Sequence, residues 1–409
     1  MVKKGYKQTE VGVIPEDWEC VLLLDKSKLL NGLTYTPDNV KNNGLLVLRS
    51  SNIQNNQLSL EDTLYVNCIV EDEKKIKDGD IMICVRNGSA ALIGKCAQAH
   101  RDYDATFGAF MAVLRGNHND YILQILQQGT IQKEIIKNSG ATINQITNGD
   151  FKIVKIALPT SNDEEIAIAS SLSNVDKLIS SLEKLITKKK AIKHGAMQEL
   201  LTGKRRLPGF FGKWVNTKIG SITEVYSGGT PNTSEPAFWG GKIPWMNSGE
   251  LNLKIVRQVQ GRITEVGMDS SSTHFIPAEC VLIGLAGQGK TRGTAAFNTF
   301  PLCTNQSIAA IYPNPNKFDS KFLYYKMDTQ YDQLRELSSG DGGRGGLNKK
   351  LILDYEVVIP QSIDEQAAIA TILTEMDYEI ENLEMKLTKY RQVKQGMMQQ
   401  LLTGKIRLV

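Results

Sequence analysis

One segment of the sequence has the residue pattern of a phosphate-binding loop. Gly284–Thr291 matches GxxxxGK[ST] and follows the apolar run Cys280–Ile283. A P-loop requires that strand and then a helix whose N-terminal amides hold phosphate. The next residues, Arg292–Pro301, include Gly, β-branched residues and Pro, which favour a strand and a turn. We therefore predict that the loop brings its backbone close to an anion such as a DNA phosphate, with Lys290 and Arg292 as contacts. The alternative interpretation of the loop is that the protein is an enzyme, a P-loop NTPase.

Other catalytic patterns are degenerate or missing. Pro37-Asp38 with Asp72-Glu73-Lys74 imitates a nuclease motif, but the gap between the two parts is long. The four histidines stand alone, and the sequence has no GxSxG, HExxH or CxxC pattern and no amino-methyltransferase motif. A glycine-rich run, Gly340–Gly346, predicts a flexible loop from which Arg344 could reach DNA. The sequence predicts no catalytic residue, no metal site and no cofactor bound by this chain.

The composition is that of a globular protein with buried thiols. Of the 409 residues, 41% are hydrophobic and 22% are charged, and no stretch of about 18 apolar residues is present. The six cysteines are scattered and mostly lie in apolar runs. We therefore expect a cytoplasmic protein with reduced cysteines and no membrane-spanning segment.

The chain contains an internal repeat. Residues 163–207 align without a gap to residues 364–408, an offset of 201, and 23 of the 45 positions are identical. Both copies contain Leu-Leu-Thr-Gly-Lys near their end, and a capping-box pattern starts two residues before each copy, at Ser161 and at Ser362. A period this long indicates two copies of a whole unit rather than a solenoid.

Apolar residues in each copy recur at spacings of four and three, which is the pattern of a coiled-coil seam. We expect two helices of roughly 40 residues, about 60 Å long, paired antiparallel. The alternative is that each helix packs only on its own domain. The seam residues are Ile168, Leu172, Val175, Ile179, Leu182 and Ile186 in the first copy, and Ile369, Leu373, Met376, Ile380, Leu383 and Leu387 in the second.

The fold class is predicted as α+β, with two mostly-β globular domains separated by the two long helices and related by a pseudo-two-fold repeat. The predicted boundaries are 1–160 and 207–361 for the domains, and 161–206 and 362–409 for the helices with their connectors. Within the domains, Asn119–Lys137 and Asp319–Leu337 are expected to be amphipathic helices. The repeated helices carry a net charge of 0 in residues 163–203 and −3 in residues 364–404. Because the whole chain carries +4, the domains and connectors carry +7, which weakly favours anion contact by the domains.

Motifs along the whole chain resemble one family. The second domain contains Ser-Gly-Gly-Thr-Pro at 227–231, Phe-Trp-Gly-Gly-Lys-Ile-Pro-Trp at 238–245, Gly-Gln-Gly-Lys-Thr-Arg-Gly at 287–293 and Cys-Thr-Asn-Gln at 303–306, and the first domain begins with the pattern Tyr6–Trp18. Together with the repeat, their order resembles the specificity subunit of type I restriction–modification enzymes. The first domain lacks the Gly-Gly-Thr-Pro and Phe-Trp-Gly-Gly motifs, so it is expected to read a different half-site.

The resemblance implies a non-catalytic subunit that recognises double-stranded DNA. Each domain would read one half of a bipartite target, and the paired helices would set the spacer and dock two methyltransferase subunits. S-adenosylmethionine would be bound by that partner, and ATP and magnesium by restriction subunits. Besides a DNA-recognition subunit and a P-loop NTPase, a scaffold protein that does not contact DNA is the third class of function considered.

Reading bases requires Arg, Lys, Asn and Gln side chains in exposed loops. Candidate residues of these types, together with Thr230 of the Gly-Gly-Thr-Pro motif, occur in the loops of both domains. They are Arg49, Asn52, Arg86 and Asn87 in the first domain and Thr230, Asn232, Asn247, Gln288, Lys290, Arg292 and Arg344 in the second.

Overall fold

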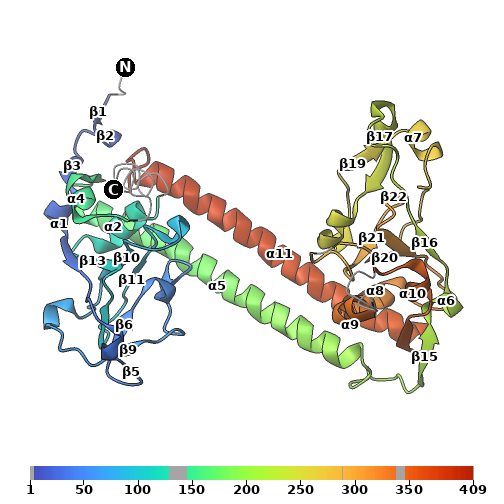
Figure 1. The fold of residues 1–409 in the computed structure, drawn as a ribbon. Coiled ribbons are helices and arrows are strands. Elements are labelled where there is room, and N and C mark those ends of the chain that lie inside the picture. Colours follow the sequence, from blue (N-terminus) through green and yellow to red (C-terminus); the bar gives the residue numbers. More distant parts are fainter. Residues whose placement is uncertain (1–3, 129–144, 288, 338–345, 409) are drawn as a thin grey trace. The chain divides into compact units, whose positions relative to one another are not determined.

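The structure, a computed structural model, describes residues 4–128, 145–287, 289–337 and 346–408. The chain divides into two compact units, residues 1–184 with 384–409 and residues 185–383. Each unit combines one domain with parts of two 39-residue helices, α5 (Asn162–Leu200) and α11 (Ile363–Leu401) (Figure 1). The sequence-based boundaries gave the helices segments of their own. In the structure, each helix begins in one unit and ends in the other.

The first domain is built from two four-stranded sheets. The first has the order β11-β10-β13-β4 and the second the order β12-β6-β9-β5, in which β12 and β6 are parallel. The strands of these sheets are β4 (Lys28–Asn31), β5 (Val40–Lys41), β6 (Leu45–Leu48), β9 (Tyr65–Val66), β10 (Ile81–Cys84), β11 (Cys96–Gln98), β12 (Ala105–Phe107) and β13 (Met111–Arg115). Smaller pairs are β1 (Tyr6–Thr9) with β2 (Gly12–Pro15), β3 (Glu19–Leu22) with β14 (Lys155–Leu158), and β7 (Ile53–Gln54) with β8 (Gln57–Leu58). The helices are α1 (Leu23–Lys26), α2 (Asn119–Leu126) and α4 (Asn148–Ile153).

The second domain repeats the central strands of this topology, with one more strand in its main sheet and one fewer in its second sheet. Its main sheet has the order β16-β23-β20-β21-β18, and its second sheet has the order β19-β17-β22, in which β17 and β22 are parallel. The strands are β16 (Val225–Ser227), β17 (Trp239–Met246), β18 (Ile255–Val256), β19 (Gly261–Ile263), β20 (Val281–Gly284), β21 (Ala295–Asn298), β22 (Cys303–Thr304) and β23 (Ile308–Ile311), with β15 (Trp214–Lys218) paired to β24 (Glu356–Pro360). The helices are α6 (Ile219–Ile222), α7 (Glu265–Asp269), α8 (Ser320–Asp328), α9 (Tyr331–Leu337) and α10 (Lys349–Leu353). The shared strand order confirms the predicted α+β class and the internal repeat.

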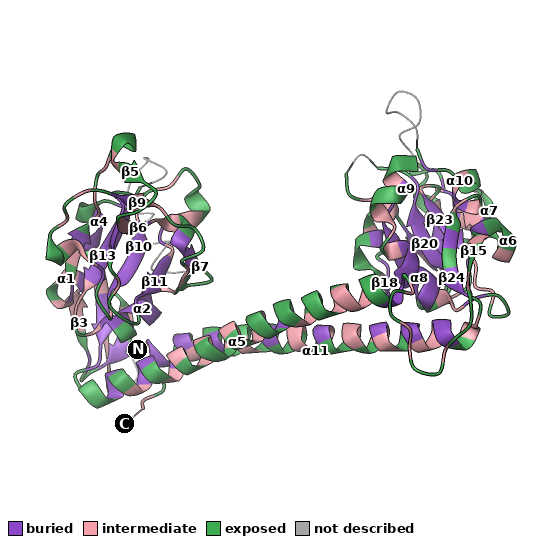
Figure 2. Cartoon of the chain, turned by 90° about the horizontal axis from the view of Figure 1, so that it is seen from below, coloured by how far each residue is buried: buried purple, intermediate pink, exposed green. Residues whose placement is uncertain are grey.

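The central strand of each main sheet is buried on both faces, as Figure 2 shows for β10 and β20. Successive side chains of a strand point to opposite faces, so one strand can serve two cores. Ile81 and Ile83 of β10 pack with α2 and with both long helices, whereas Met82 faces the core shared with the second sheet. In the second unit, Ile283 and Leu282 divide between two cores in the same way.

The long helices pair antiparallel within each unit, as predicted. In the first unit, Lys394 of α11 binds Asp176 of α5 at 2.7 Å. In the second unit, Lys193 of α5 binds Asp377 of α11. These are the same pair at the repeat offset of 201 with the helices exchanged, so both units have the same helix register. Asp377 also accepts from Tyr325 Oη at 2.7 Å.

The seam residues all lie on inward-facing sides of the helices. Seven are buried, namely Ile168, Leu172, Ile186, Ile369, Leu373, Ile380 and Leu387, and Val175, Ile179, Leu182, Met376 and Leu383 are half-buried. The first two positions of each helix belong to the core of its own domain. Packing on the domain, which we had considered as an alternative, therefore coexists with helix pairing.

A tryptophan, a glutamate and an arginine join the first domain to the helices. Trp18 Nε1 donates to Glu164 Oε2 at 3.1 Å, and Arg407 donates to the two oxygens of Glu164 at 2.6 and 2.8 Å. Arg407 also donates to Asp17 at 2.6 Å. Burial opposes ionisation of Glu164, but the hydrogen bonds from Arg407 and Trp18 outweigh it and lower the pKa of this carboxyl group.

The second unit repeats this joint. Arg206 donates to the two oxygens of Glu365 at 2.6 and 2.8 Å, and its guanidinium carbon lies 6.0 Å from the centre of the Trp214 ring. The sequence predicted these glutamates as partners in capping boxes. The Ser161 hydroxyl does accept from the Glu164 amide at 3.3 Å, but the Glu164 carboxylate binds Arg407 and Trp18 instead of the helix start.

The two predicted amphipathic helices are shorter than expected. In place of one helix over Asp319–Leu337, α8 ends at Asp328 and α9 begins at Tyr331. The Thr329 hydroxyl binds the Lys326 carbonyl, which caps the end of α8. In the first domain α2 ends at Leu126, and the rest of the predicted helix lies mostly outside the described residues.

Candidate nucleic-acid interface

Three loops of the first domain meet at one edge of its sheets. They follow β6, follow β10 and connect β12 to β13. The Gly108 amide donates to the Leu48 carbonyl at 3.0 Å, and the Val85 amide donates to the Phe110 carbonyl at 3.0 Å. The Asn87 side chain donates to the Ser50 hydroxyl at 3.0 Å. These contacts bring the predicted residues Arg49, Arg86 and Asn87 into one cluster of loops.

The corresponding loops of the second domain meet in the same way. The Asn305 amide donates to the Met246 carbonyl at 3.0 Å, and the Leu285 amide donates to the Ser307 carbonyl at 2.8 Å. Thr230 Oγ1 donates to Gln306 Oε1 at 2.5 Å, which ties the Gly-Gly-Thr-Pro segment to this cluster. The repeat therefore presents two loop clusters on the same scaffold.

In the first cluster, the candidate side chains differ in how far they are available. Arg86 is exposed, and its guanidinium lies 5.3 Å from the centre of the Phe110 ring. Arg49 pairs with Asp62 at 2.8 Å. Asn52 is fully buried, accepts from the Arg49 amide and donates to the carbonyls of Ser59 and Asp62. The structure therefore contradicts a DNA contact by Asn52, because its amide holds the loop together.

In the second domain, two of the candidate asparagines are exposed but take part in turns. Asn247 Oδ1 accepts from the Gly249 amide at 2.8 Å, and its Nδ2 donates to Glu250 at 3.2 Å. Asn232 Oδ1 accepts from the Ser234 amide at 3.0 Å. Gln288 and Arg344 lie outside the described residues.

The glycine-rich segment 284–291 connects two antiparallel strands. β20 is followed by the loop and then by β21, which pairs with β20, so no helix follows the glycines as a P-loop requires. Helix α9 holds the loop, since Arg335 donates to the Gly289 carbonyl at 2.7 Å and Tyr331 to the Lys290 carbonyl at 3.3 Å. The Lys290 side chain is exposed and Arg292 is half-buried. The geometry confirms a strand and turn and gives the NTPase alternative no support.

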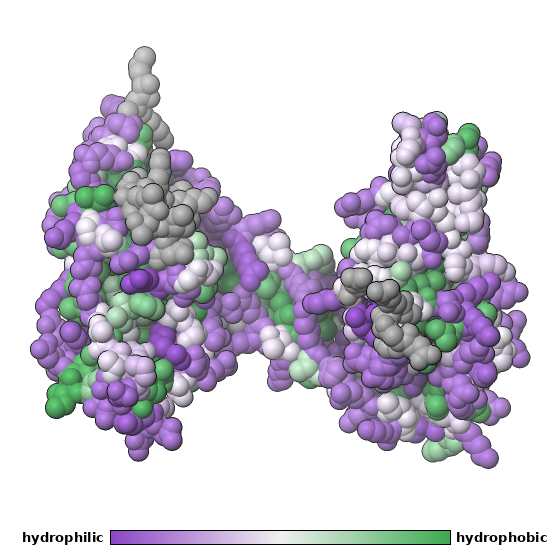
Figure 3. Space-filling view, in the orientation of Figure 1, coloured by the Kyte–Doolittle hydropathy of each residue, from purple (hydrophilic) through white to green (hydrophobic). Residues whose placement is uncertain are grey.

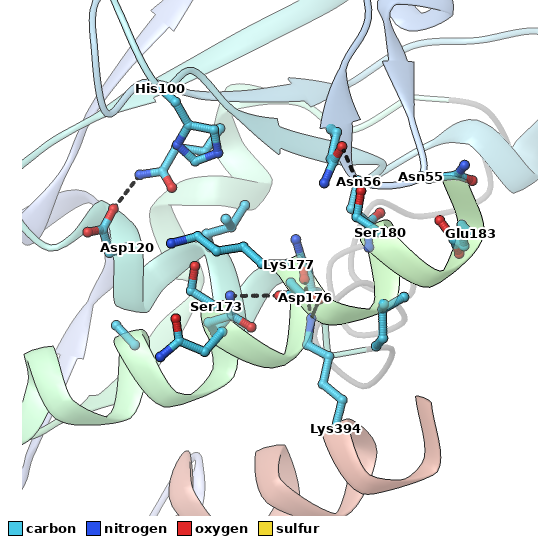
Figure 4. A pocket seen from close by; sticks show the side chains of 18 of the residues that line it. Asn55, Asn56, His100, Asp120, Ser173, Asp176, Lys177, Ser180, Glu183 and Lys394 are labelled. Atoms are coloured by element: carbon cyan, nitrogen blue, oxygen red, sulfur yellow. Dashed lines mark hydrogen bonds and ion pairs between the residues drawn. The ribbon is translucent and has the colours of Figure 1, made fainter. Parts of the chain in front are cut away.

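A pocket of about 1160 Å³ lies in the first unit, between the β7–β8 hairpin, α2 and the long helices (Figure 4). Its lining is rich in amide and hydroxyl side chains, including Asn55, Asn56, Ser173 and Ser180. Four of its charged groups form two ion pairs, Asp176 with Lys394 and Glu183 with Arg391, and Gln98 donates to Asp120 at 2.6 Å. This arrangement is typical of a structural joint rather than of a catalytic site.

The described residues contain no group of three or more His, Cys, Asp or Glu side chains placed to hold a metal ion. All six cysteines are free thiols, and burial raises the pKa of Cys96 and Cys280 to about 12 and that of Cys303 to about 11. These three thiols are therefore protonated at neutral pH and poorly nucleophilic. In the described part of the chain, no helix is both long enough and apolar enough to span a membrane.

Two residues that matter in this geometry were not predicted. Phe110 is 56% exposed in the first loop cluster, although an apolar residue directly before a strand gives little signal in sequence. Arg407 could have been found, because Arg206 and Arg407 occupy matching positions of the 201-residue repeat.

Comparison with known proteins gives one family. The family model described as type I restriction modification DNA specificity domain matches residues 15–194 and again 212–389. The StySPI specificity subunit of a type I restriction enzyme from Salmonella potsdam is 23% identical over 88% of this chain and 81% of its own length. The EcoKI specificity subunit of Escherichia coli is 28% identical over 48% of this chain and 46% of its own.

Solved structures show the same fold. The crystal structure of a type I restriction-modification S subunit from M. genitalium superposes with a TM-score of 0.65 at 16% identity, covering 94% of this chain and 96% of that one. A chain from a structure concerned with complex assembly of the type I R-M system gives a TM-score of 0.56 at 15% identity, with 96% and 99% covered.

Proposed function

The chain belongs to the family of type I restriction modification DNA specificity domains, and on that premise we propose that each of its two domains reads one half of a bipartite DNA target. The observation that carries this proposal is the repeated loop cluster. Both clusters stand on the same strand order, but their side chains differ. Arg86 and Phe110 occupy the first cluster, whereas Ser307, Gln306 and Lys290 occupy the second. One scaffold with two sets of loop side chains suits the reading of two different half-sites.

The long helices are proposed to fix the spacer between the half-sites. A 39-residue helix is about 58 Å long, which exceeds the roughly 34–36 Å between half-sites one DNA turn apart. Since α5 and α11 pair in the same register in both units, we take the length of the helices as the quantity that sets the spacer.

The same helices are proposed to dock two methyltransferase subunits. Leu178, Leu185 and Ile192 recur every seven residues on α5 and are 38%, 38% and 47% exposed, and Met385 of α11 is 62% exposed. Residues seven apart share a helix face, and hydrophobic patches are visible on the exposed surface of the long helices in Figure 3. Residues 163–203 carry no net charge, so the apolar stripe on α5 favours docking of an amphipathic helix from a partner.

In this assembly the chain supplies selectivity and the partners supply chemistry. The methyltransferase subunits would bind S-adenosylmethionine and methylate adenine, and restriction subunits would use ATP and magnesium. The complex would act in the cytoplasm, where double-stranded host DNA is present. The domains and connectors carry a net charge of only +7, so we expect affinity to depend strongly on the partners.

Methylome sequencing of a host that expresses this chain with its methyltransferase tests the proposal. The expected result is one bipartite adenine-methylation motif with a fixed non-specific spacer. Exchange of residues 208–360 for another family member's second domain should change one half of the motif only. A continuous motif, or changes in both halves, would contradict the proposal.

A scaffold without DNA contact is tested separately by gel shifts. The complex of this chain with its methyltransferase should prefer duplexes that carry the mapped motif over duplexes with either half scrambled. Equal binding to all duplexes would favour the scaffold.

A further inference from the structure

The Phe110 side chain is held outside the core by a loop whose backbone is hydrogen-bonded to both neighbouring loops. Its carbonyl accepts from the Val85 amide at 3.0 Å and from the Arg86 amide at 3.2 Å, while Gly108, two residues earlier, donates to Leu48. The backbone is therefore fixed on both sides of the loop. The ring is nevertheless 56% exposed, with the Arg86 guanidinium 5.3 Å from its centre.

The internal repeat identifies this position as variable between the two domains. The carbonyl that occupies the place of Phe110 in the second domain belongs to Ser307, which accepts from the Leu285 amide at 2.8 Å as Phe110 accepts from Val85. Beside Ser307 lies the hydrogen-bonded pair of Thr230 and Gln306. The same point of the scaffold thus presents an aromatic ring in one domain and small polar groups in the other, as expected where two domains read different bases.

We propose that Phe110 reads a thymine in the half-site of the first domain by contact with its C5-methyl group, an inference that rests on the proposed function. In the major groove, this methyl group is the apolar feature that distinguishes thymine from the other bases. Contact with a methyl group would remove the exposed ring from water, and the Arg86 guanidinium on its face supplies a cation that can contact a phosphate. Phe110 is therefore a specificity-determining residue that the polar candidates Arg49, Arg86 and Asn87 do not replace.

Deoxyuridine substitution tests this contact. The full complex of this chain with its methyltransferase subunits is titrated with duplexes in which each thymine of the first half-site is replaced in turn by deoxyuridine. We expect one position at which loss of the methyl group weakens binding about fourfold, which corresponds to the roughly 0.8 kcal/mol of one buried methylene-sized group. In Phe110→Ala, the thymine and deoxyuridine duplexes should bind equally at that position, and Phe110→Leu should keep part of the difference.

Ile153→Ala is the matched control, because Ile153 at the end of α4 is 57% exposed and lies outside the loop cluster. It should keep the full difference between the two duplexes. Bipartite binding by the wild-type complex without any methyl-sensitive thymine in the first half-site would overturn the inference alone. So would a Phe110→Ala complex that retains the difference. If the wild-type complex shows no bipartite preference, the proposed function fails, and the inference fails with it.

Discussion

Buried charge in this protein is concentrated where a domain meets the long helices. Glu164 is 1% exposed and is held by Arg407 and Trp18. A carboxylate in such a place stabilises the fold only while its partners are present, because the uncompensated charge would be costly. The residue is therefore a sensitive reporter of the joint.

We expect Glu164→Gln to lower the free energy of unfolding by about 2–3 kcal/mol at neutral pH. The pKa of Glu164 in the folded state lies below its ordinary value of 4.5. The stabilisation is therefore fully present above about pH 4.5 and is lost as the pH falls through the folded pKa. Chemical denaturation from pH 7 to pH 3 should show the wild type and the variant converging in acid. A constant difference across that range would count against the ionised joint.

Two glycines of α11 and its C-terminal turn should respond to alanine in opposite ways. Gly404 has φ +64°, and an added Cβ would lie 2.4 Å from Pro15 Cγ, so Gly404→Ala should cost about 2 kcal/mol or more. Gly396 lies in the exposed helix with nothing within 4 Å, so Gly396→Ala should stabilise by up to about 1 kcal/mol. Thermal unfolding of the two variants checks the signs. Equal effects would show that the contact with Pro15 is not limiting.

For single residues, the sequence could predict which residue types suit DNA contact but not which of these side chains are exposed to make it. In the sequence, Arg86 and Asn52 are equally plausible DNA contacts. In the structure, the Arg86 side chain is exposed, whereas the Asn52 amide donates to the carbonyls of Ser59 and Asp62. Asparagine serves turns and base edges with the same groups. Whether an asparagine side chain holds a turn or reads a base depends on how the loop folds, and the residues next to the asparagine in sequence do not determine that.

Helices were predicted more accurately than the roles of single residues where an apolar pattern continues over many turns. The seam at spacings of four and three predicted helices that the structure places at Asn162–Leu200 and Ile363–Leu401. The helix predicted over Asp319–Leu337 was too long, because its break at Thr329 depends on a local hydroxyl cap. Short strands such as β12 carry three residues and leave little pattern to detect.

The helix pairing depends on the repeated lysine–aspartate pair. Lys394→Met leaves Asp176 without this cation and should cost about 2 kcal/mol, because among the described residues the other donor to that carboxylate is Gln124. The double variant Lys394→Met/Asp176→Leu should recover most of the loss. The matched variant Lys193→Met should cost less, since Asp377 keeps the Tyr325 hydroxyl. Denaturant titration of the three variants gives the order, and a larger loss in Lys193→Met would refute it.

The loop between β20 and β21 is expected to act on DNA through phosphate contact. Lys290→Ala should weaken binding of the complex to all duplexes alike and reduce the salt slope of log Kd by about 1. The loop itself should persist, because Arg335 and Tyr331 hold its backbone carbonyls. Lys321→Ala, an exposed lysine of α8, is the control. Loss of preference for one base, or micromolar ATP affinity that disappears with Lys290, would contradict this role.

At the scale of the whole molecule, the connector after α5 and the tail after α11 make the same contact, each in its own unit. Arg206 and Arg407 each lie six residues after the end of a long helix, and each binds the glutamate at the start of the other helix. Each unit is therefore completed by a segment that is distant in sequence. The repeat offset of 201 could have predicted this exchange, whereas the identity of the bases that each domain reads depends on loop geometry beyond the sequence.

The proposed spacing role of the helices predicts the effect of a paired deletion. Removal of Ile179–Leu185 from α5 and of Ile380–Lys386 from α11 takes matching heptads from both copies of the repeat. Seven residues shorten a helix by about 10 Å, or about three base pairs, and turn its end by only about 20°. Methylation mapping should find the same two half-sites with a shorter spacer. Deletion from α5 alone should abolish methylation, because it shifts Lys193 out of register with Asp377. The original spacer in the paired variant would show that the helices do not set the distance.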